Sequence, residues 1–253
     1  MFVGGTVNQK LVAQWKKEEQ IPFKGWDFSY LEDRLFIEEP PWSYERLAQQ
    51  FMRSAQSMLD MGTGGGEELS SLAPFPKKTV ATEGYAPNVA LARKKLEPLG
   101  ITVVDVAKEN PLPFQNKTFD LILNRHEAFD AQEVHRLLKP KGIFLTQQVG
   151  GDDLQDLISL FSAKRTYDVR IQPSQDAITR AGFTIKEAQE WRGKFEFKDV
   201  SAVVYYLKAI PWIVPGFSVA KYRSQLTALQ KQVDAGRPLV FTQSRFYILA
   251  QKP

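Results

Sequence analysis

The sequence contains no cysteine and only two histidines in 253 residues. Disulfide bonds, thiolate zinc sites and cysteine nucleophiles are therefore excluded, and a histidine-based zinc site is disfavoured. We expect no metal to be required, and a divalent ion held by carboxylates stays the open alternative. No apolar run approaches the roughly 20 residues that span a bilayer. The first residues also lack the basic and apolar segments of a signal peptide. We therefore expect a cytoplasmic protein without a membrane segment.

The sequence also has no large excess of positive or negative charge. The net charge is +4 and the pI is about 9.1, which permits an anionic partner but does not require one. The sequence shows neither a concentrated basic stripe nor an accessory RNA-binding domain. The hydrophobic fraction of 43% is sufficient for a core. The length suits one α/β domain with additions, or two small domains.

Glycine is concentrated in one short stretch. The apolar strand pattern of residues 57–61 is followed by four glycines within residues 62–66, and then by a helix pattern that begins at Glu67. A strand, a glycine turn and a helix start are typical of a site where a nucleotide-like ligand lies over the carboxyl end of a parallel strand. The predicted cofactor contacts in this turn are Asp60, Gly62, Thr63 and Gly64.

The same turn lacks the motifs of a phosphate-bearing cofactor. The dinucleotide pattern G-x-G-x-x-G/A fails because its last position falls on Glu67 or Leu69, and no G-K-[ST] follows. Asp60, Glu67 and Glu68 would also repel a pyrophosphate. An adenosine-containing cation without phosphate, such as S-adenosylmethionine, fits this acidic turn better. A nicotinamide-dependent oxidoreductase is correspondingly disfavoured.

A carboxylate follows the second predicted strand, residues 78–82. The two oxygens of Glu83 can accept hydrogen bonds from both hydroxyls of a ribose. Its separation from Gly66 (83 − 66 = 17 residues) is close to the roughly 20 residues that separate a glycine turn from its ribose-binding acid. We therefore expect Glu83, Gly84 and Tyr85 to contact the adenosine, with Tyr85 beside the adenine.

Residues Asp60-Met-Gly-Thr-Gly-Gly-Gly66 resemble motif I, [DE]-x-G-x-G-x-G, of the class I S-adenosylmethionine-dependent methyltransferases of type 11. Further matches follow in the order of that family, at residues 112–114 (L-P-F), 119–120 (F-D) and 138–142 (L-K-P-x-G). They extend to about residue 150 and do not name a substrate. The resemblance implies that S-adenosylmethionine is the cofactor.

The adenine-binding segment departs from the family pattern. Where the family usually has an Asp that contacts the adenine amino group, this sequence has Lys108. Asp105 or Glu109 can serve instead, and the two alternatives stay open. The backbone of Val106 and Ala107 is the predicted edge that faces the adenine.

The resemblance also implies the fold, which is an α/β fold. We expect a Rossmann-like, seven-stranded, mostly parallel sheet with helices on both faces, an antiparallel last strand and a helical cap. The predicted segments are an amino-terminal helical and aromatic extension that forms a lid (1–56), the cofactor-binding core (57–192), a helical cap insertion (193–238) and the last strand of the core (239–253).

Several residues of the extension and of the insertion are candidates for contact with cofactor or acceptor. They are Trp26, Asp27 and Tyr30 in the lid, and Tyr205, Tyr206, Trp212 and Phe217 in the cap. The alternative is that the aromatic side chains only pack in a hydrophobic core, which is the commonest place for them.

The segment Asn124-Arg125-His126-Glu127 follows the fourth predicted strand, at the sheet edge where the cofactor is expected. His126 is the candidate general base, which takes a proton from a hydroxyl or an amine as that group attacks the sulfonium methyl. The alternative is that His126 is structural or binds the methionine end. Asn124 and Arg125 are predicted cofactor contacts.

These features predict a methyltransferase that transfers a methyl group by direct displacement to an oxygen or nitrogen of a small molecule. Methylation of ribosomal or other RNA is one alternative, because a related subset of the family acts on ribosomal RNA. A non-catalytic binding protein with this fold is another. A DNA substrate is not expected. Enzymes that methylate amino groups of nucleic acids carry an Asn/Asp-Pro-Pro-aromatic loop after the fourth strand, and this sequence has Asn124-Arg125-His126-Glu127 there instead. The oligomeric state is left open.

Overall fold

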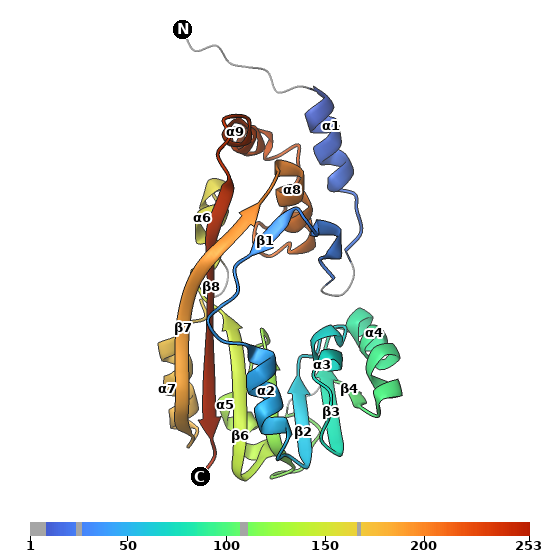
Figure 1. The fold of residues 1–253 in the computed structure, drawn as a ribbon, viewed down its shortest axis with the longest axis vertical. Coiled ribbons are helices and arrows are strands. Elements are labelled where there is room, and N and C mark those ends of the chain that lie inside the picture. Colours follow the sequence, from blue (N-terminus) through green and yellow to red (C-terminus); the bar gives the residue numbers. More distant parts are fainter. Residues whose placement is uncertain (1–8, 24–26, 107–110, 166–167) are drawn as a thin grey trace. The chain divides into compact units, whose positions relative to one another are not determined.

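The computed structural model of the chain describes residues 9–23, 27–106, 111–165 and 168–253 (Figure 1). The chain divides into two compact units. Unit 1 comprises Met1–Glu39, Asp152–Asp168 and Arg192–Ser244, and unit 2 comprises Pro40–Gly151, Val169–Trp191 and Arg245–Pro253. No helix in the described part of the chain is both long enough and apolar enough to cross a bilayer.

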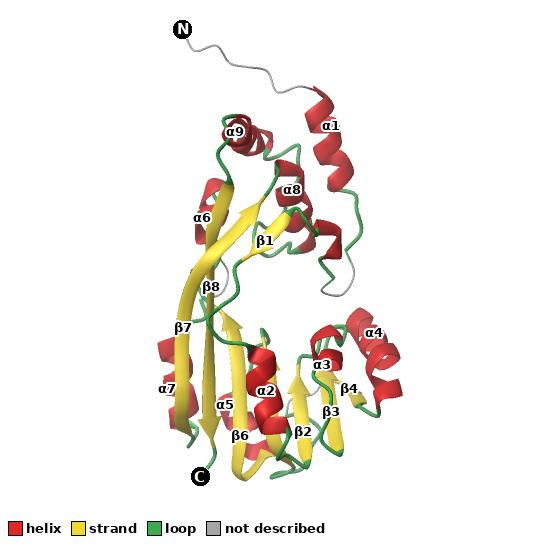
Figure 2. Ribbon diagram, viewed as in Figure 1, coloured by secondary structure: helices red, strands yellow, loops and turns green. Residues whose placement is uncertain are grey.

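An eight-stranded sheet has the order β1-β7-β8-β6-β5-β2-β3-β4 (Figure 2). The strands are β1 Leu35–Ile37, β2 Ser57–Met61, β3 Lys78–Glu83, β4 Thr102–Asp105, β5 Phe119–Arg125, β6 Leu138–Val149, β7 Thr184–Phe197 and β8 Leu239–Gln251. Strands β4, β3, β2, β5 and β6 pair in parallel, whereas β8 is antiparallel to β6 and β1 is antiparallel to β7. The predicted α/β fold with a mostly parallel sheet and an antiparallel last strand is confirmed.

The sheet has eight strands where seven were predicted. The additional strand is β1, whose residues Leu35, Phe36 and Ile37 pair with the final residues of β7. This β1 segment lies in a part of the sequence rich in aromatics and prolines, and three residues are too few to show the alternation that predicts a strand. Strand β7 also continues to Phe197, beyond the boundary after residue 192 where the helical cap insertion was predicted to begin.

Helices cover both faces of the sheet in unit 2. Consecutive residues of β2 belong to different clusters of buried side chains, with Met58 in one and Leu59 in the other. The first cluster contains side chains of α2 Tyr44–Met52, α3 Glu67–Ser71 and α4 Ala86–Leu96. The second contains side chains of α5 Ala131–Leu137 and α7 Ile171–Arg180. Successive strand residues point to opposite faces, so a parallel sheet covered on both sides has apolar side chains on both.

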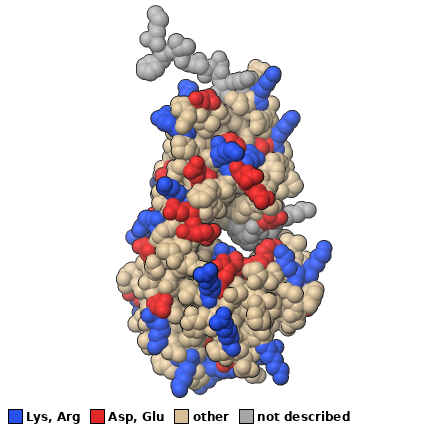
Figure 3. All heavy atoms as spheres, viewed as in Figure 1, with Lys and Arg blue, Asp and Glu red and all other residues tan. Residues whose placement is uncertain are grey.

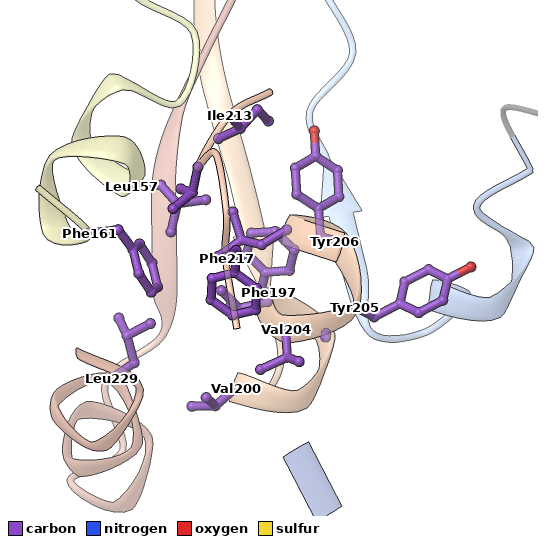
Figure 4. Close-up of a cluster of buried hydrophobic side chains, with 14 of the residues drawn as sticks. Leu157, Phe161, Phe197, Val200, Val204, Tyr205, Tyr206, Ile213, Phe217 and Leu229 are labelled. Carbon is purple, nitrogen blue, oxygen red and sulfur yellow. The ribbon is translucent and has the colours of Figure 1, made fainter. Parts of the chain in front are cut away.

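Unit 1 is organised around α8 Val200–Ala209, in which every residue except Lys208 is buried. Around it pack side chains of α1 Gln9–Glu18, α6 Gln155–Leu160, α9 Arg223–Asp234 and the last residues of β7. Figure 4 shows Tyr206, Phe197 and Phe217 within this cluster. A helix that is apolar all round is expected only inside a core.

The two units divide the chain differently from the predicted segments. The extension 1–56 does not form one body, because Ala48 and Met52 of α2 pack in a core of unit 2. The segment around α6 was assigned to the cofactor-binding core, yet Leu157 and Phe161 pack in the core of unit 1. Sequence separation alone does not show which buried faces meet.

Replacing Arg34 by lysine is expected to destabilise unit 1 by roughly 1–3 kcal/mol, because lysine cannot make a two-pronged bond to a carboxylate. The Arg34 guanidinium donates from Nε to Asp199 Oδ2 (3.0 Å) and from Nη2 to Asp199 Oδ1 (2.9 Å), and also reaches Glu18 Oε1 (3.3 Å). Asp199 in turn caps α8 by accepting from the backbone N–H of Ala202. Although burial opposes ionisation of Asp199, Arg34 and this N–H lower its pKa.

Hydrogen exchange of the α8 amides measures this loss, because it reports the opening of unit 1 by itself. The matched control is Arg93→Lys, since the Arg93–Glu97 pair is longer (3.9 Å) and both side chains are about half exposed. That change is expected to alter stability by no more than about 0.5 kcal/mol. Equal exchange in the two variants would show that the Arg34 cluster contributes nothing.

Candidate cofactor site at the carboxyl edge of the sheet

The glycine turn lies between β2 and α3, as predicted. Gly62, Gly64 and Gly66 all have positive φ, at 72°, 63° and 85°, and Gly66 precedes the first residue of α3. The turn is tied to the neighbouring strand by a hydrogen bond from the Thr63 N–H to the Thr82 carbonyl (2.9 Å). Positive φ at three positions explains why glycine occupies them, since other residues pay a steric penalty there.

Glu127 lies against this turn and has no role in the sequence-based prediction of the site. An ideal Cβ on Gly62 would lie 2.6 Å from the Cβ of Glu127, so only glycine leaves room for this side chain. Burial, followed by the negative charge of Glu83, raises the pKa of Glu127. The sequence offered one signal for it, namely its position directly after His126 at the end of a core strand.

Glu83 is the last residue of β3 and is buried. Its Oε1 accepts hydrogen bonds from the N–H groups of Gly84 (2.8 Å) and Tyr85 (2.7 Å). No described residue donates to its other oxygen, Oε2. The carboxylate is therefore held by one oxygen and leaves the second for a ligand hydroxyl, whereas the predicted ribose contact used both oxygens, so that contact stays a prediction.

The predicted adenine edge is described in part. Val106 donates its N–H to the Glu83 carbonyl (3.0 Å), which places the end of β4 beside the ribose-binding candidate. Asp105 is the register partner of Glu83 across the β3–β4 pair. Tyr85 has a 64% exposed side chain and is free of the core. Ala107, Lys108 and Glu109 lie outside the described residues, so the choice between Asp105 and Glu109 stays open.

Asn124 and Arg125 end β5 beside the glycine turn. Asn124 is fully buried, and its Oδ1 accepts from Thr146 Oγ1 (2.8 Å) and Gln148 Nε2 (2.6 Å). Its Nδ2 is buried and has no partner among the described residues. Arg125 forms an ion pair with Glu68 (2.7 Å). A buried amide without a partner calls for an explanation, and a ligand or an ordered water is the usual one.

Acidic groups gather around Arg125. Burial raises the pKa of Glu68 to about 7. The positive charge of Arg125 acts to lower this pKa, and the negative charge of Glu45 acts to raise it. The guanidinium also lies over the ring of Tyr44, 5.8 Å from its centroid. Glu68 was identified in the sequence only as a group that would repel a pyrophosphate. Its pairing with Arg125, and the contribution of α2 through Tyr44 and Glu45, required the tertiary structure.

Replacing Asp60 by asparagine is expected to remove a pH-dependent loss of stability. Burial raises the pKa of Asp60 from 3.8 to about 6, although Thr63 and Arg125 lower it. Between about pH 4 and 6 the folded chain keeps a proton that the unfolded chain releases, so the free energy of unfolding falls as the pH rises. Above pH 6 the variant should exceed the wild type by up to about 3 kcal/mol, and near pH 4 the two should be equal.

Urea denaturation at both pH values checks this expectation. A difference between variant and wild type that is the same at pH 4 and pH 7.5 would contradict it. Retention of a carboxylate that costs stability indicates a role in binding rather than in folding.

His126 directly follows β5 with a positive φ of 60°, which is uncommon for a residue other than glycine. Its side chain reaches solvent, yet the surrounding protein removes part of its hydration. This desolvation, followed by the positive charges of Arg245 and Arg125, lowers the pKa of His126 well below its usual value. The imidazole is therefore neutral at pH 7. Among the described residues, no cluster of three or more His, Asp and Glu side chains could hold a metal.

The lid and cap candidates fall into two groups. Tyr205, Tyr206 and Phe217 are buried in the core of unit 1, where Tyr30 packs on Tyr205 with ring centroids 4.6 Å apart. Trp212 remains 42% exposed. Trp26 lies outside the described residues. Packing in the core of unit 1 explains Tyr205, Tyr206 and Phe217, and a role over the cofactor stays a prediction.

The class of the domain follows from comparison with known families. Residues 59–146, which include the glycine turn, Glu83 and Asn124, match the family model described as a methyltransferase domain. Residues 59–146 are thus similar to methyltransferase domains. One solved structure with this fold, phosphoethanolamine N-methyltransferase 2 of Haemonchus contortus, is in complex with S-adenosylmethionine; it is 15% identical, with a TM-score of 0.51 over 97% of this chain and 57% of that chain. The free oxygen of Glu83 and the glycine turn that a Cβ would fill both fit an adenosine at this edge.

Individual relatives of the methyltransferase domain carry different names. Arginine-hydroxylase NDUFAF5 of Mus musculus is 30% identical over 152 residues, which cover 56% of this chain and 41% of the relative. A proposed 23S rRNA (guanine-N(1)-)-methyltransferase of Bacillus subtilis (strain 168), YxjB, is 27% identical over 187 residues, or 69% of this chain and 63% of the relative. The chain thus spans less than two thirds of the length of either.

Solved structures share the fold. A proposed methyltransferase from Bacillus halodurans C-125 superposes with a TM-score of 0.59 at 21% identity, over 84% of this chain and 100% of that chain. At this identity the likeness concerns the architecture of the sheet and helices. It carries no information about the acceptor.

Proposed function

We propose that this protein is an S-adenosylmethionine-dependent methyltransferase that transfers a methyl group to an oxygen or nitrogen of a small molecule. The observation that carries the proposal is Glu83, a buried carboxylate at the end of β3 with one oxygen unused by the described chain, beside a turn that only glycine can form. The matched methyltransferase domain contains both features. When bound, S-adenosylmethionine supplies an electrophilic methyl group on a sulfonium.

The residues at this edge then contact different parts of the cofactor. Glu83 accepts from the ribose hydroxyls, and the exposed Tyr85 ring packs beside the adenine, whose edge faces the backbone of Val106 and Ala107. The methionine end lies by Asn124 and Arg125, and the turn from Asp60 to Gly64 approaches the adenosine closely. Catalysis in such a site comes mostly from positioning and exclusion of water.

His126 is the proposed general base of the reaction. Because its pKa is lowered, the imidazole is unprotonated at neutral pH and can take a proton from an attacking hydroxyl or amine. This role puts the imidazole in contact with the acceptor rather than with the adenosine.

Replacing His126 by alanine is expected to lower turnover by roughly 10²–10⁴-fold while leaving the affinity for S-adenosylmethionine unchanged. Single-turnover kinetics measure the first quantity and calorimetry the second. An equal loss of both would assign His126 to the cofactor's methionine end. Unchanged turnover would show that the acceptor loses its proton elsewhere.

Titration calorimetry with S-adenosylmethionine and, separately, with NAD tests the cofactor. Incubation with methyl-labelled S-adenosylmethionine and either a metabolite extract or total RNA then tests the acceptor. Label in the small-molecule fraction supports the proposal, whereas binding without transfer indicates a non-catalytic binding protein. Because some relatives are named for arginine hydroxylation, mass spectrometry should distinguish an added methyl group from an added oxygen.

RNA is the second candidate acceptor, and the similarity to YxjB favours it. On the face drawn in Figure 3, Lys and Arg side chains are interspersed with Asp and Glu. A surface of mixed sign is less suited to a phosphate backbone than a basic stripe. Transfer of label to RNA that is lost at high salt would nevertheless decide for this alternative.

A further inference from the structure

Trp42, Gln147 and His126 form a line of side chains in unit 2, and the proposed function uses only His126 of the three. The indole Nε1–H of Trp42 donates to Gln147 Oε1 at 2.7 Å. The Nε2 of Gln147 lies 3.4 Å from the Nε2 of His126. The same two residues are also joined through the backbone, because the His126 N–H donates to the Gln147 carbonyl (2.8 Å).

The order of donors and acceptors along this line is fixed at one end. An indole nitrogen can only donate, so the atom of Gln147 that faces Trp42 must be the amide oxygen. The NH₂ group of Gln147 therefore faces the imidazole. An NH₂ group can only donate, so the facing ring atom, Nε2, must accept. A neutral imidazole that accepts at Nε2 carries its hydrogen on Nδ1.

All three members of the line are held in place. Gln147 is 5% exposed, so its amide cannot turn toward water. The Trp42 ring packs on Tyr247, with ring centroids 5.0 Å apart, and the Tyr247 hydroxyl donates to Glu187 (3.1 Å). The positive φ of His126 is the kind of local strain that persists only where the surroundings fix the conformation.

We propose that Gln147, oriented by Trp42, is a positioning residue that holds His126 as the Nδ1–H tautomer with Nε2 unprotonated. The tautomer itself does not depend on the proposed function. Its catalytic consequence rests on that function. The single lone pair of Nε2 faces the Gln147 NH₂ across 3.4 Å, so the acceptor's O–H or N–H group must replace this long contact before Nε2 takes its proton. In the free protein a proton on Nε2 would lie opposite the Gln147 NH₂, so Gln147 favours the neutral ring. The positive charges of Arg245 in β8 and Arg125 in β5 act in the same direction.

Nitrogen-15 NMR of the imidazoles in the cofactor-free protein tests the proposal. The chain has only two histidines, so the spectrum contains two ring systems, and a His135→Gln variant assigns them. At pH 7.5 the wild type should show His126 as the Nδ1–H tautomer. A wild-type spectrum with the hydrogen on Nε2 would overturn the proposal without any substitution.

Two variants test the parts played by Gln147 and Trp42. In Gln147→Glu the facing atom becomes an acceptor, so the His126 tautomer should switch to Nε2–H and its pKa should rise by roughly 1–2 units. In Trp42→Phe the amide is free to turn, and both tautomers should appear. His135 is the internal control and should not change in either variant. Unchanged His126 signals in both variants would show that Gln147 does not position the ring.

The kinetic readout separates this proposal from the proposed function. With an acceptor in hand, Gln147→Glu should move the acidic limb of the turnover–pH profile upward together with the His126 pKa. A confirmed tautomer in a protein that transfers no methyl group would refute the proposed function alone. Transfer with the wrong tautomer would refute the role of Gln147 alone.

Discussion

Replacing Gly66 by alanine should lower the free energy of unfolding of unit 2 by roughly 2–5 kcal/mol, the sum of backbone strain and overpacking. Gly66 has a φ of 85°, and an ideal Cβ there would lie 2.8 Å from Cγ and 3.0 Å from Cδ1 of Leu96. Leu96 is fully buried in α4, so its side chain has no open space to move into. The added methyl group therefore forces α3 and α4 apart or strains Leu96.

The matched control is Gly100→Ala. Gly100 also has a positive φ, 79°, but nothing lies within 4 Å of its ideal Cβ. Gly100→Ala should therefore lose only the free energy of the backbone strain, about 1–2 kcal/mol. The difference in unfolding free energy between the two variants then measures the contact with Leu96. Urea denaturation of both proteins, with hydrogen exchange of the β2 amides, gives the two values. An equal loss of unfolding free energy in the two variants would mean that Leu96 moves away from the added methyl group without destabilising the fold.

Replacing Glu83 by glutamine should weaken S-adenosylmethionine binding by roughly 5–150-fold, which corresponds to 1–3 kcal/mol for hydrogen bonds to a charged acceptor. The amide oxygen of glutamine can still accept from the N–H groups of Gly84 and Tyr85, so the local backbone is preserved. The other terminal atom becomes an NH₂ group, which cannot accept from a ribose hydroxyl. The loss therefore reports on the ligand and not on the fold.

Titration calorimetry measures the effect, and Glu97→Gln provides the control. Glu97 is about half exposed and pairs only loosely with Arg93. Its substitution removes a carboxylate from the same unit without touching the sheet edge, so affinity should stay at the wild-type value. Wild-type affinity in Glu83→Gln as well would remove Glu83 from the ribose site, and with it the main support for the proposed function.

Local signals in the sequence were sufficient for the order of the core elements. The strand before the glycine turn, the turn itself and Glu83 are each specified within a few residues, by apolar runs, by the need for positive φ and by a strand end. The resemblance implied a mostly parallel sheet with an antiparallel last strand, and β4, β3, β2, β5 and β6 pair in parallel while β8 is antiparallel to β6. These parts of the prediction are confirmed for that reason.

Features that depend on contacts between segments far apart in the sequence were not predicted. The three-residue β1 is stabilised only by its pairing with the end of β7, about 160 positions later in the chain. The sequence analysis placed α2 in the amino-terminal extension, although its side chains pack in a core of unit 2. The apolar face of a helix shows that the helix packs on something, but it does not show on which element. An amphipathic pattern shows that a surface is buried and leaves open against what.

The sequence by itself determined the similarity to methyltransferase domains and the kind of cofactor that we propose, since both depend on short contiguous motifs whose conformation is set locally. Only the tertiary structure decided the surroundings of those motifs: Glu127 against Gly62, Glu68 on Arg125, and Gln147 between Trp42 and His126. These contacts join residues from separate strands, helices and loops. Sheet register and helix packing bring them within a few ångströms, and no spacing along the chain encodes that distance.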